Sequence, residues 1–313
     1  MNAEHKPSDG LISGVLPAVL SPLHADLSPD HTRHIRHCSW LLANGCDGLA
    51  IHGTTGEANS FSVGERVATL EALAAGGIDG SRIIAGTGCC ALPDSVTLNK
   101  AALQIGAAGV LMLPPFYYKN VSDEGLFAGY SEVIQRVGDA ALKIYLYHFP
   151  ALSGVPITLS LIERLLSAYP NTVVGVKDSA GDFENMKAMA TQFPGFQVFA
   201  GSERLLLDCL EIGGAGTISA TVNVTSLQAS QVFAAWKNGD DEAAKKHQDR
   251  LTNSRLAIED YPLVPALKAI IAQHTGNDGW LTLRPPLVAL PGAKRTALFD
   301  AIERIDLDLA EAA

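Results

Sequence analysis

The sequence has few cysteines, no excess of positive charge and no long apolar run. Its five cysteines are an odd number without CxxC spacing, which favours a reducing compartment over a disulfide framework. The net charge of −10 argues against a nucleic-acid or anionic-membrane partner. No run of about 20 apolar residues predicts a membrane span, and the opening residues do not resemble a signal peptide. We therefore expect a cytoplasmic protein that acts on small molecules.

Eight short β-rich runs alternate with longer amphipathic segments along the first two thirds of the chain. Near-continuous apolar strands indicate a parallel sheet, and eight such units predict a closed (β/α)8 TIM barrel over residues 14–223. Residues 224–313 read as a C-terminal helical extension packed on the barrel, so residues 1–313 are expected to form one domain. The predicted strands are GVLPAVL from Gly14, GLAI from Gly48, RIIAG from Arg82, GVLML from Gly109, KIYLY from Lys143, VVGVK from Val173, QVFA from Gln197 and GTIS from Gly216.

Several segments carry helix-boundary signals. Ser62 and Glu65 have the spacing of a capping box before RVATLEALAAGG, and ITLSLIERLLSAYP stops at Pro170. In the extension, helices are expected over LQASQVFAAWKNG, DEAAKKHQDRLTNSRLAIEDY, VPALKAIIAQHTG and the closing KRTALFDAIERIDLDLAEAA.

Unusual polar residues fall where the predicted strands end, which is where barrels of this kind build their active sites. Thr54 and Thr55 follow the second strand in a glycine-bracketed turn, whose hydroxyls and N–H groups are suited to holding a carboxylate. Tyr117 follows the fourth strand, the fifth delivers Tyr147, and the sixth ends in Lys177. Ile218 and Ser219 end the eighth strand.

A lysine in a barrel mouth beside these hydroxyls indicates amine chemistry. A desolvated, neutral Lys177 would attack a 2-oxo acid to form an imine, an electron sink for breaking a neighbouring C–C bond. Tyr147 would carry the proton, provided that its hydroxyl is hydrogen-bonded to another, such as that of Thr54. Taken singly, each residue has a structural alternative: Lys177 as a solvated strand end, Tyr147 as a packing aromatic and the GTTGE turn as a helix cap.

Two other segments imitate functional motifs. HTRHIRHC, residues 31–38, has near-helical spacing of possible metal ligands, but Arg33 and Arg36 between them favour a solvated helix face. GGAG, residues 213–216, precedes a strand instead of opening a helix, so it lacks the context of a phosphate-binding loop. We expect neither a metal nor an organic cofactor.

Five motifs in order give a more specific indication than any single residue. The chain resembles the dihydrodipicolinate synthase and N-acetylneuraminate lyase family of class I, Schiff-base aldolases, from about Gly14 to LRPPL at residues 283–287. The motifs that carry this resemblance are GTTGE, PPFYYK, YHFPALSG, GVKDSAGD and GGAGTISATVNV.

The resemblance implies a barrel with C-terminal helices, usually a homotetramer with a dimer as the alternative, that binds pyruvate or a pyruvate-yielding substrate. Lys177 matches the Schiff-base lysine, Tyr147 the proton-transferring phenol and Tyr117 a relay tyrosine from a neighbouring subunit. Thr54 and Thr55 match the pair that relays protons and holds the 2-oxo acid carboxylate. Residues expected to bind substrate with Thr55 are Gly53, Ser179, Gly201 and, through its backbone, Ile218.

Departures from the family pattern narrow the expected reaction. Leu152 stands where the synthases carry an arginine for the aldehyde substrate's carboxylate, and leucine cannot hold a carboxylate. PALSG resembles the neuraminate lyases and 2-keto-3-deoxy sugar acid aldolases, whereas KDSAGD is similar to the hydroxy-oxoglutarate aldolases. Neuraminate lyase itself is disfavoured, because its GSTGE and its acidic pair appear here as GTTGE and GSER. Arg204 would meet a far-end carboxylate or face solvent, and His148 is expected to support the strand end.

The sequence thus predicts an aldolase that cleaves a 4-hydroxy-2-oxo acid, of the 2-keto-3-deoxy sugar acid or 4-hydroxy-2-oxoglutarate type, to pyruvate and an aldehyde. The alternatives are dihydrodipicolinate synthase or a 2-keto-3-deoxy acid dehydratase on the same scaffold, and a noncatalytic barrel that binds 2-oxo acids.

Overall fold

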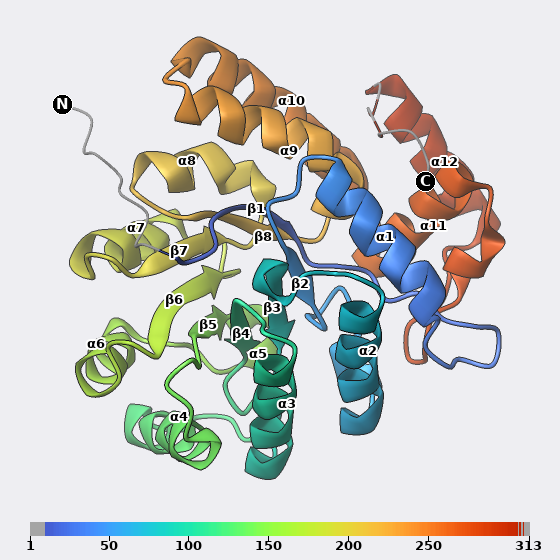
Figure 1. Cartoon of the computed structure of the whole chain (residues 1–313). Helices are drawn as coiled ribbons and strands as arrows, with labels where there is room; N and C mark the ends of the chain where they lie inside the picture. Colours follow the sequence, from blue (N-terminus) through green and yellow to red (C-terminus); the bar gives the residue numbers. More distant parts are fainter. Residues whose placement is uncertain (1–9, 306, 308, 310–313) are drawn as a thin grey trace.

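The computed structural model describes residues 10–305, 307 and 309, and its eight strands form a parallel barrel (Figure 1). The strands pair in the order β1-β8-β7-β6-β5-β4-β3-β2. A parallel bridge between Ala18 and Ala50 joins the first strand to the second and closes the barrel. All eight predicted strands are confirmed, as β1 (Gly14–Pro17), β2 (Leu49–Ile51), β3 (Ile83–Gly86), β4 (Gly109–Met112), β5 (Ile144–His148), β6 (Val173–Asp178), β7 (Gln197–Ala200) and β8 (Gly216–Ser219).

Helices follow the strands and surround the barrel, so the predicted (β/α)8 class is confirmed (Figure 1). The apolar layer between strands and helices is the largest buried cluster of the molecule. These helices are α1 (His31–Ala43), α2 (Val63–Ala75), α3 (Leu92–Gln104), α4 (Asp123–Val137), the short α5 (Pro150–Ser153), α6 (Leu159–Ala168), α7 (Phe183–Gln192), α8 (Leu206–Glu211) and α9 (Val222–Lys237).

The predicted helix boundaries of two segments are confirmed. Ser62 caps α2 by accepting from the backbone N–H of Glu65, whose carboxylate accepts from the N–H of Ser62 in return. Helix α6 ends at Ala168, before Pro170.

The barrel interior is filled by a separate cluster around Tyr145, which is fully buried and donates a 2.7 Å hydrogen bond to Gln197. Two glycines make room for its ring. A Cβ atom at Gly109 or Gly175 would lie 2.7 Å from ring carbons of Tyr145. The two glycines of β4 and β6 thus leave room for this large aromatic residue within the interior cluster.

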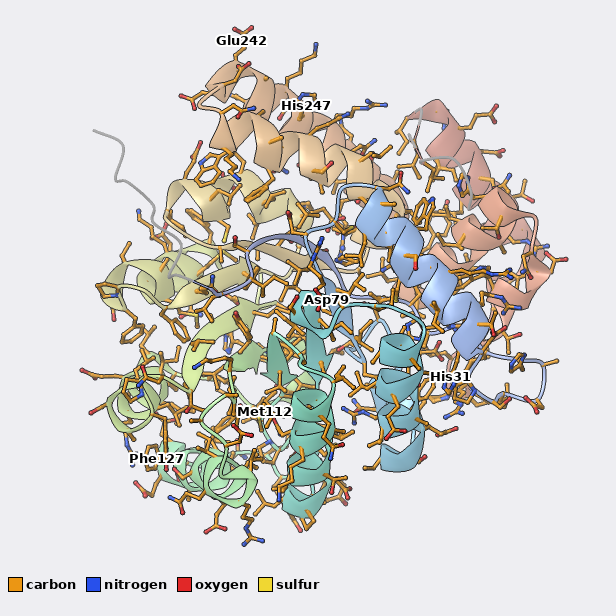
Figure 2. All side chains as sticks on the ribbon, viewed as in Figure 1. His31, Asp79, Met112, Phe127, Glu242 and His247 are labelled. Carbon is orange, nitrogen blue, oxygen red and sulfur yellow. The ribbon has the colours of Figure 1, made fainter. Side chains whose placement is uncertain are left out.

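Three further helices follow the barrel: α10 (Asp241–Glu259), α11 (Leu263–Thr275) and α12 (Gly292–Arg304). Figure 2 shows Glu242 projecting from α10 away from the barrel, while Leu251 on another face of the helix is fully buried. The predicted boundary at residues 223 and 224 falls inside α9, and the single-domain division stays a prediction. The last predicted helix ends at Arg304, and its predicted continuation includes residues outside the described ones.

The expectation for the histidine-rich segment is wrong in part. His34, His37 and Cys38 of α1 are buried instead of forming a solvated face, because this side of the helix packs on the molecule. Arg36 is exposed. Within residues 10–305 and the two described residues beyond them, no group of three or more His, Cys, Asp or Glu side chains is placed to hold a metal ion.

No helix of the described chain is both long and apolar enough to span a membrane.

Candidate active site

The amine of Lys177 lies in the mouth of the barrel beside Tyr147. The two residues are register partners on β6 and β5, so their side chains point to the same face of the sheet. Lys177 Nζ donates a 3.3 Å hydrogen bond to Oη of Tyr147 and lies 4.4 Å from the centroid of its ring. Only 4% of Lys177 and 3% of Tyr147 is exposed. Lys177 is therefore a buried amine and not a strand end that reaches solvent.

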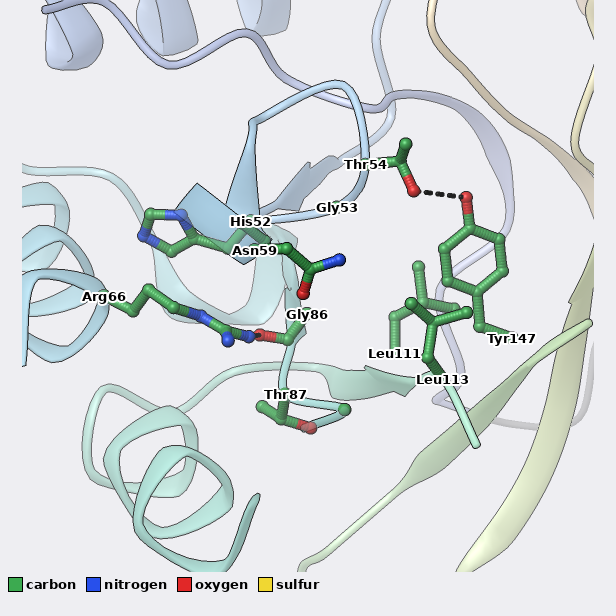
Figure 3. Close-up of a pocket in the computed structure, with 12 residues that line it drawn as sticks. His52, Gly53, Thr54, Asn59, Arg66, Gly86, Thr87, Leu111, Leu113 and Tyr147 are labelled. Atoms are coloured by element: carbon green, nitrogen blue, oxygen red, sulfur yellow. Dashed lines mark hydrogen bonds between the residues drawn. The ribbon is translucent and has the colours of Figure 1, made fainter. Parts of the chain in front are cut away.

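Thr54 extends this contact into a chain of three polar groups. Its Oγ1 lies 3.3 Å from Oη of Tyr147, and either oxygen can donate the hydrogen (Figure 3). Thr54 is exposed, whereas Lys177 is buried. The chain therefore leads from the amine toward the open end of the barrel, with the phenol in the middle, and it has the order that proton transfer requires.

The loop that carries Thr54 and Thr55 is held through Glu57. The backbone N–H of Glu57 donates to the carbonyl of Thr54 at 3.0 Å, and Thr55 is buried. The Glu57 carboxylate forms a 2.5 Å ion pair with Lys268 of α11, and neither side chain is exposed. The C-terminal extension thus fixes the position of the loop that follows β2.

A cavity of about 330 Å³ opens over this group of residues. Its walls include the candidate residues Lys177, Tyr147, Thr54, Thr55, Ser179 and Gly201, so the structure brings six predicted site residues together. Leu152, which is 63% exposed, lies at the same cavity. Its remaining lining residues are Phe149, Asp178, Gly181, Ser202, Leu205, Ala220, Arg255, Leu263 and Val264.

A second, much smaller cavity adjoins Tyr147 (Figure 3). It has a volume of about 20 Å³, enough for one water molecule. Gly53 and Thr54 line it from the loop after β2, together with Asn59 and Thr87. Gly53 therefore lines the small cavity beside Tyr147 and not the larger cavity where substrate binding was predicted.

Besides Gly53, two predicted residues do not line the larger cavity within this chain. Ile218 is fully buried in the cluster that fills the barrel, and its side chain packs there. Tyr117 is 75% exposed and packs edge-to-face against Tyr118. Tyr117 therefore lies outside the cavity in the single chain.

Asp178 is a buried carboxyl next to the lysine. Its Oδ1 accepts a 2.8 Å hydrogen bond from the N–H of Ala180, whereas Oδ2 is buried and has no partner among the described residues. Burial raises the pKa of Asp178 to about 6, with a smaller contribution from Asp182.

Sequence reasoning missed Arg255, which reaches the cavity from α10. Its guanidinium is 13% exposed and lies 3.5 Å from the fully buried Glu203. Its Nε forms a 2.8 Å ion pair with Glu259, and its Nη1 donates to Thr221 at 3.3 Å. No strand-end rule points to a residue in the helical extension, so the sequence held no direct signal for it.

Arg204 and His148 have structural partners. Arg204 is 45% exposed, forms a 2.9 Å ion pair with Glu259 and does not line the cavity. His148 is buried, and its Nδ1 accepts a 3.0 Å hydrogen bond from the N–H of Ile157. The predicted support of the strand end by His148 is confirmed.

Comparison with known proteins gives a match over nearly the whole chain. Residues 11–305 match the Dihydrodipicolinate synthetase family. A relative from Chloroflexus aurantiacus, named an uncharacterized DapA-like lyase, is 37% identical over 293 residues, which cover 93% of this chain and 96% of the relative.

Two solved structures share the fold. Dihydrodipicolinate synthase from Agrobacterium tumefaciens has a TM-score of 0.85 and 32% identity, covering 93% of this chain and 99% of its own. YagE from Escherichia coli K12, a family protein solved in complex with pyruvate, has a TM-score of 0.87 and 26% identity, covering 95% and 99%. The buried lysine, the phenol and the threonine loop thus lie on a shared scaffold, and the chain belongs to the dihydrodipicolinate synthase family and is a lyase.

Proposed function

We propose that this protein is a class I aldolase that cleaves a 4-hydroxy-2-oxo acid to pyruvate and an aldehyde. The observation that carries the proposal is the chain from Lys177 through Tyr147 to Thr54 at the wall of a cavity of about 330 Å³. Reversible binding of a 2-oxo acid needs no buried amine beside a phenol, whereas C–C cleavage through an imine uses the amine as nucleophile and the phenol as proton carrier.

The proposed reaction starts when the neutral amine of Lys177 attacks C2 of the substrate; one proton is taken up and water leaves, forming a protonated imine. Tyr147 then passes its own proton to the Thr54 hydroxyl and takes the proton from the C4 hydroxyl as the C3–C4 bond breaks. The bonding electrons move into the protonated imine, which becomes an enamine, and the aldehyde leaves. Protonation at C3 and hydrolysis of the imine release pyruvate and restore the lysine.

The threonine loop supplies the carboxylate contact in this proposal. Thr55 is buried at the cavity wall, and Thr54 links the loop to the phenol. Tyr117, which is exposed here, would complete the proton relay from a neighbouring subunit of a homotetramer or dimer. The complex of YagE with pyruvate supports a 2-oxo acid as the bound half of the substrate.

The far end of the substrate would meet Arg255, because Leu152 offers no polar group. Arg255 is already paired with Glu203 and Glu259 at 3.5 and 2.8 Å. Its charge is therefore largely balanced, which suits neutral hydroxyl groups better than a second carboxylate. This favours a 2-keto-3-deoxy sugar acid over 4-hydroxy-2-oxoglutarate.

Dihydrodipicolinate synthase activity is the second candidate. It is favoured by the 32% identity to the Agrobacterium synthase and disfavoured by Leu152. Product analysis separates the reactions, since cleavage releases pyruvate, condensation consumes it, and a dehydratase leaves the carbon skeleton intact.

The test is intact mass after addition of pyruvate and borohydride, followed by peptide mapping. We expect a reduced adduct on Lys177, its loss in Lys177→Ala, and no change in Lys187→Ala, which alters an exposed lysine of α7. An adduct that persists in Lys177→Ala would contradict the mechanism. Pyruvate release from 2-keto-3-deoxygluconate and from 4-hydroxy-2-oxoglutarate then ranks the substrates.

A further inference from the structure

A separate cavity of about 220 Å³ lies between α1 and α11, two helices that are neighbours in Figure 1. It shares no lining residue with the catalytic cavity. Nothing in the proposed reaction uses it. Its size exceeds the roughly 150 Å³ that holds a benzene ring in an engineered protein cavity.

Aromatic rings form its walls. His37 stacks on Trp40 with ring centroids 5.8 Å apart, and Trp280 meets the His37 ring edge-on at 4.9 Å. His274 lies 6.1 Å from Trp40. Trp40 and Trp280 are only 7% and 3% exposed, so the rings are fixed by packing. Flat, rigid walls of this kind favour a planar apolar ligand.

The polar groups of the cavity are cationic or neutral. Arg36 is exposed and takes part in none of the ion pairs found in the described part of the chain, whereas Arg33 is held by Asp30 at 3.2 Å. Burial lowers the pKa of His37 to about 4, so its neutral ring donates from Nε2 to Asn223 at 2.9 Å. None of the described lining residues is acidic. The cavity therefore offers one uncommitted positive charge.

His274 supplies a second polar atom without a partner. Its Nε2 is buried and has no hydrogen bond among residues 10–305, 307 and 309. A buried ring nitrogen is normally satisfied by protein, water or ligand. His274 and Arg36 line the same cavity as the two tryptophans.

We propose that this cavity binds a small planar organic carboxylate. The flat ring packs against Trp40 and Trp280, and the carboxylate pairs with the Arg36 guanidinium, which matches two carboxylate oxygens geometrically. His274 Nε2 donates the remaining hydrogen bond. The site is independent of the catalytic cavity and of the reaction assigned to it.

Benzoate is the probe, and binding is measured by calorimetry and by tryptophan fluorescence, since two of the three tryptophans line the cavity. We expect saturable binding that weakens about tenfold or more in Arg36→Gln, because a charge-assisted hydrogen bond is lost. Benzyl alcohol, which has the ring without the charge, is expected to bind less tightly by a similar factor. Arg136→Gln is the matched control, an exposed helical arginine of α4.

Lys177→Ala distinguishes this site from the catalytic cavity and should leave benzoate binding unchanged. The proposal is overturned by any of three results: no binding at millimolar benzoate, equal affinity in Arg36→Gln, or loss of binding in Lys177→Ala.

His274→Phe provides an independent check, since it removes the nitrogen and keeps an aromatic wall. Unchanged affinity in that variant would contradict the proposed hydrogen bond from His274. Arg36 is exposed and unpaired, so its replacement does not disturb the fold.

Discussion

The phenol oxygen of Tyr147 lies between Lys177 and Thr54. In the proposed reaction, the amine and the phenol serve two different steps. Lys177 donates to the phenol oxygen at 3.3 Å, and Thr54 lies at the same distance on the other side. Imine formation at Lys177 requires a nucleophilic amine, whereas C–C cleavage requires removal of a proton from the substrate hydroxyl. A change at Tyr147 therefore separates the two steps.

We predict that Tyr147→Phe still forms a borohydride-trapped pyruvate adduct but loses turnover by roughly 10²- to 10⁴-fold, the usual contribution of a positioned acid or base. The aromatic ring and its 5.8 Å stacking on Phe149 are kept, so the fold should be retained. The measurements are adduct mass and pyruvate release from the 4-hydroxy-2-oxo acid. Turnover within threefold of the parent enzyme would exclude Tyr147 as the proton carrier.

Asp178 gives a pH prediction with a definite sign. Its pKa is raised by burial from 3.8 to about 6, so the fold disfavours the charged form. The protonated form is present in both states below pH 3.8, stability is lost as pH rises from 3.8 to about 6 because only the unfolded state is then ionised, and the loss is complete above pH 6. Asp178→Asn keeps the acceptor for Ala180 and should therefore gain stability over the parent by up to about 3 kcal/mol between pH 4 and pH 7.

Urea unfolding at several pH values measures this difference. Asp208→Asn, which changes an exposed carboxylate of α8, is the control and should show a much smaller pH trend. A stability difference between Asp178→Asn and the parent that stays flat from pH 4 to pH 7 would contradict the role of burial.

Among the single residues of the candidate site, the positions that could be predicted from the sequence are those at the ends of strands. Lys177 and Tyr147 end neighbouring strands, so their proximity follows from the parallel register of β5 and β6. Arg255 could not be predicted, because it depends on how α10 packs over the barrel. The buried faces of His34 and His37 were also missed, since interleaved arginines concealed the apolar side of α1.

At the scale of elements, the loop after β2 and helix α11 form one unit. Glu57 accepts from Lys268 at 2.5 Å and from the backbone N–H of Arg284 at 3.1 Å, and Lys268 also donates to the carbonyl of Thr282 at 2.9 Å. Both charges are fully buried. The loop of Thr54 and Thr55 thus depends on residues more than 200 positions further along the chain.

We predict that Lys268→Met destabilises the protein by about 3–5 kcal/mol, since it leaves Glu57 as an uncompensated buried charge. Adding Glu57→Gln to that variant removes the charge and should recover part of the loss. Urea unfolding of both single variants and the double variant gives the coupling energy. Additive effects of the two changes would show that the ion pair does not hold the loop.

Local sequence signals predicted most of the helices and strands named above, but they did not predict the contacts between them. Strand runs and the Ser62 capping box predicted β1 to β8 and the start of α2. The start of α9 at Val222 was not predicted, because its first turn is β-branched and non-helical angles at Thr225 interrupt it. The ion pair of Glu57 and Lys268 has no local sequence signal at all.

At the scale of the whole molecule, the C-terminal helices complete a cavity that the barrel only begins. Leu263 and Val264 line it with Arg255, while Lys177 and Tyr147 belong to the strands. Tyr117 is the one predicted catalytic residue that stays outside, 75% exposed on the loop after β4. If the proposed relay operates, a neighbouring chain must supply it.

Mixing two inactive variants tests this arrangement. Lys177→Ala lacks the nucleophile but offers an intact Tyr117, whereas Tyr117→Ala retains Lys177 and lacks the relay. In a mixed dimer, Lys177 of one chain meets the intact Tyr117 of the other.

Equal mixing with free exchange makes half of the dimers mixed, and each mixed dimer has one intact site of two. Roughly a quarter of the parent activity should therefore return. The unfractionated mixture measures this recovery, and mixed dimers isolated through two affinity tags should show roughly half of the parent pyruvate release, because one of their two sites is intact. Activity no higher than that of Tyr117→Ala alone would place Tyr117 in its own chain's site or outside the reaction, because neither arrangement is rescued by a partner.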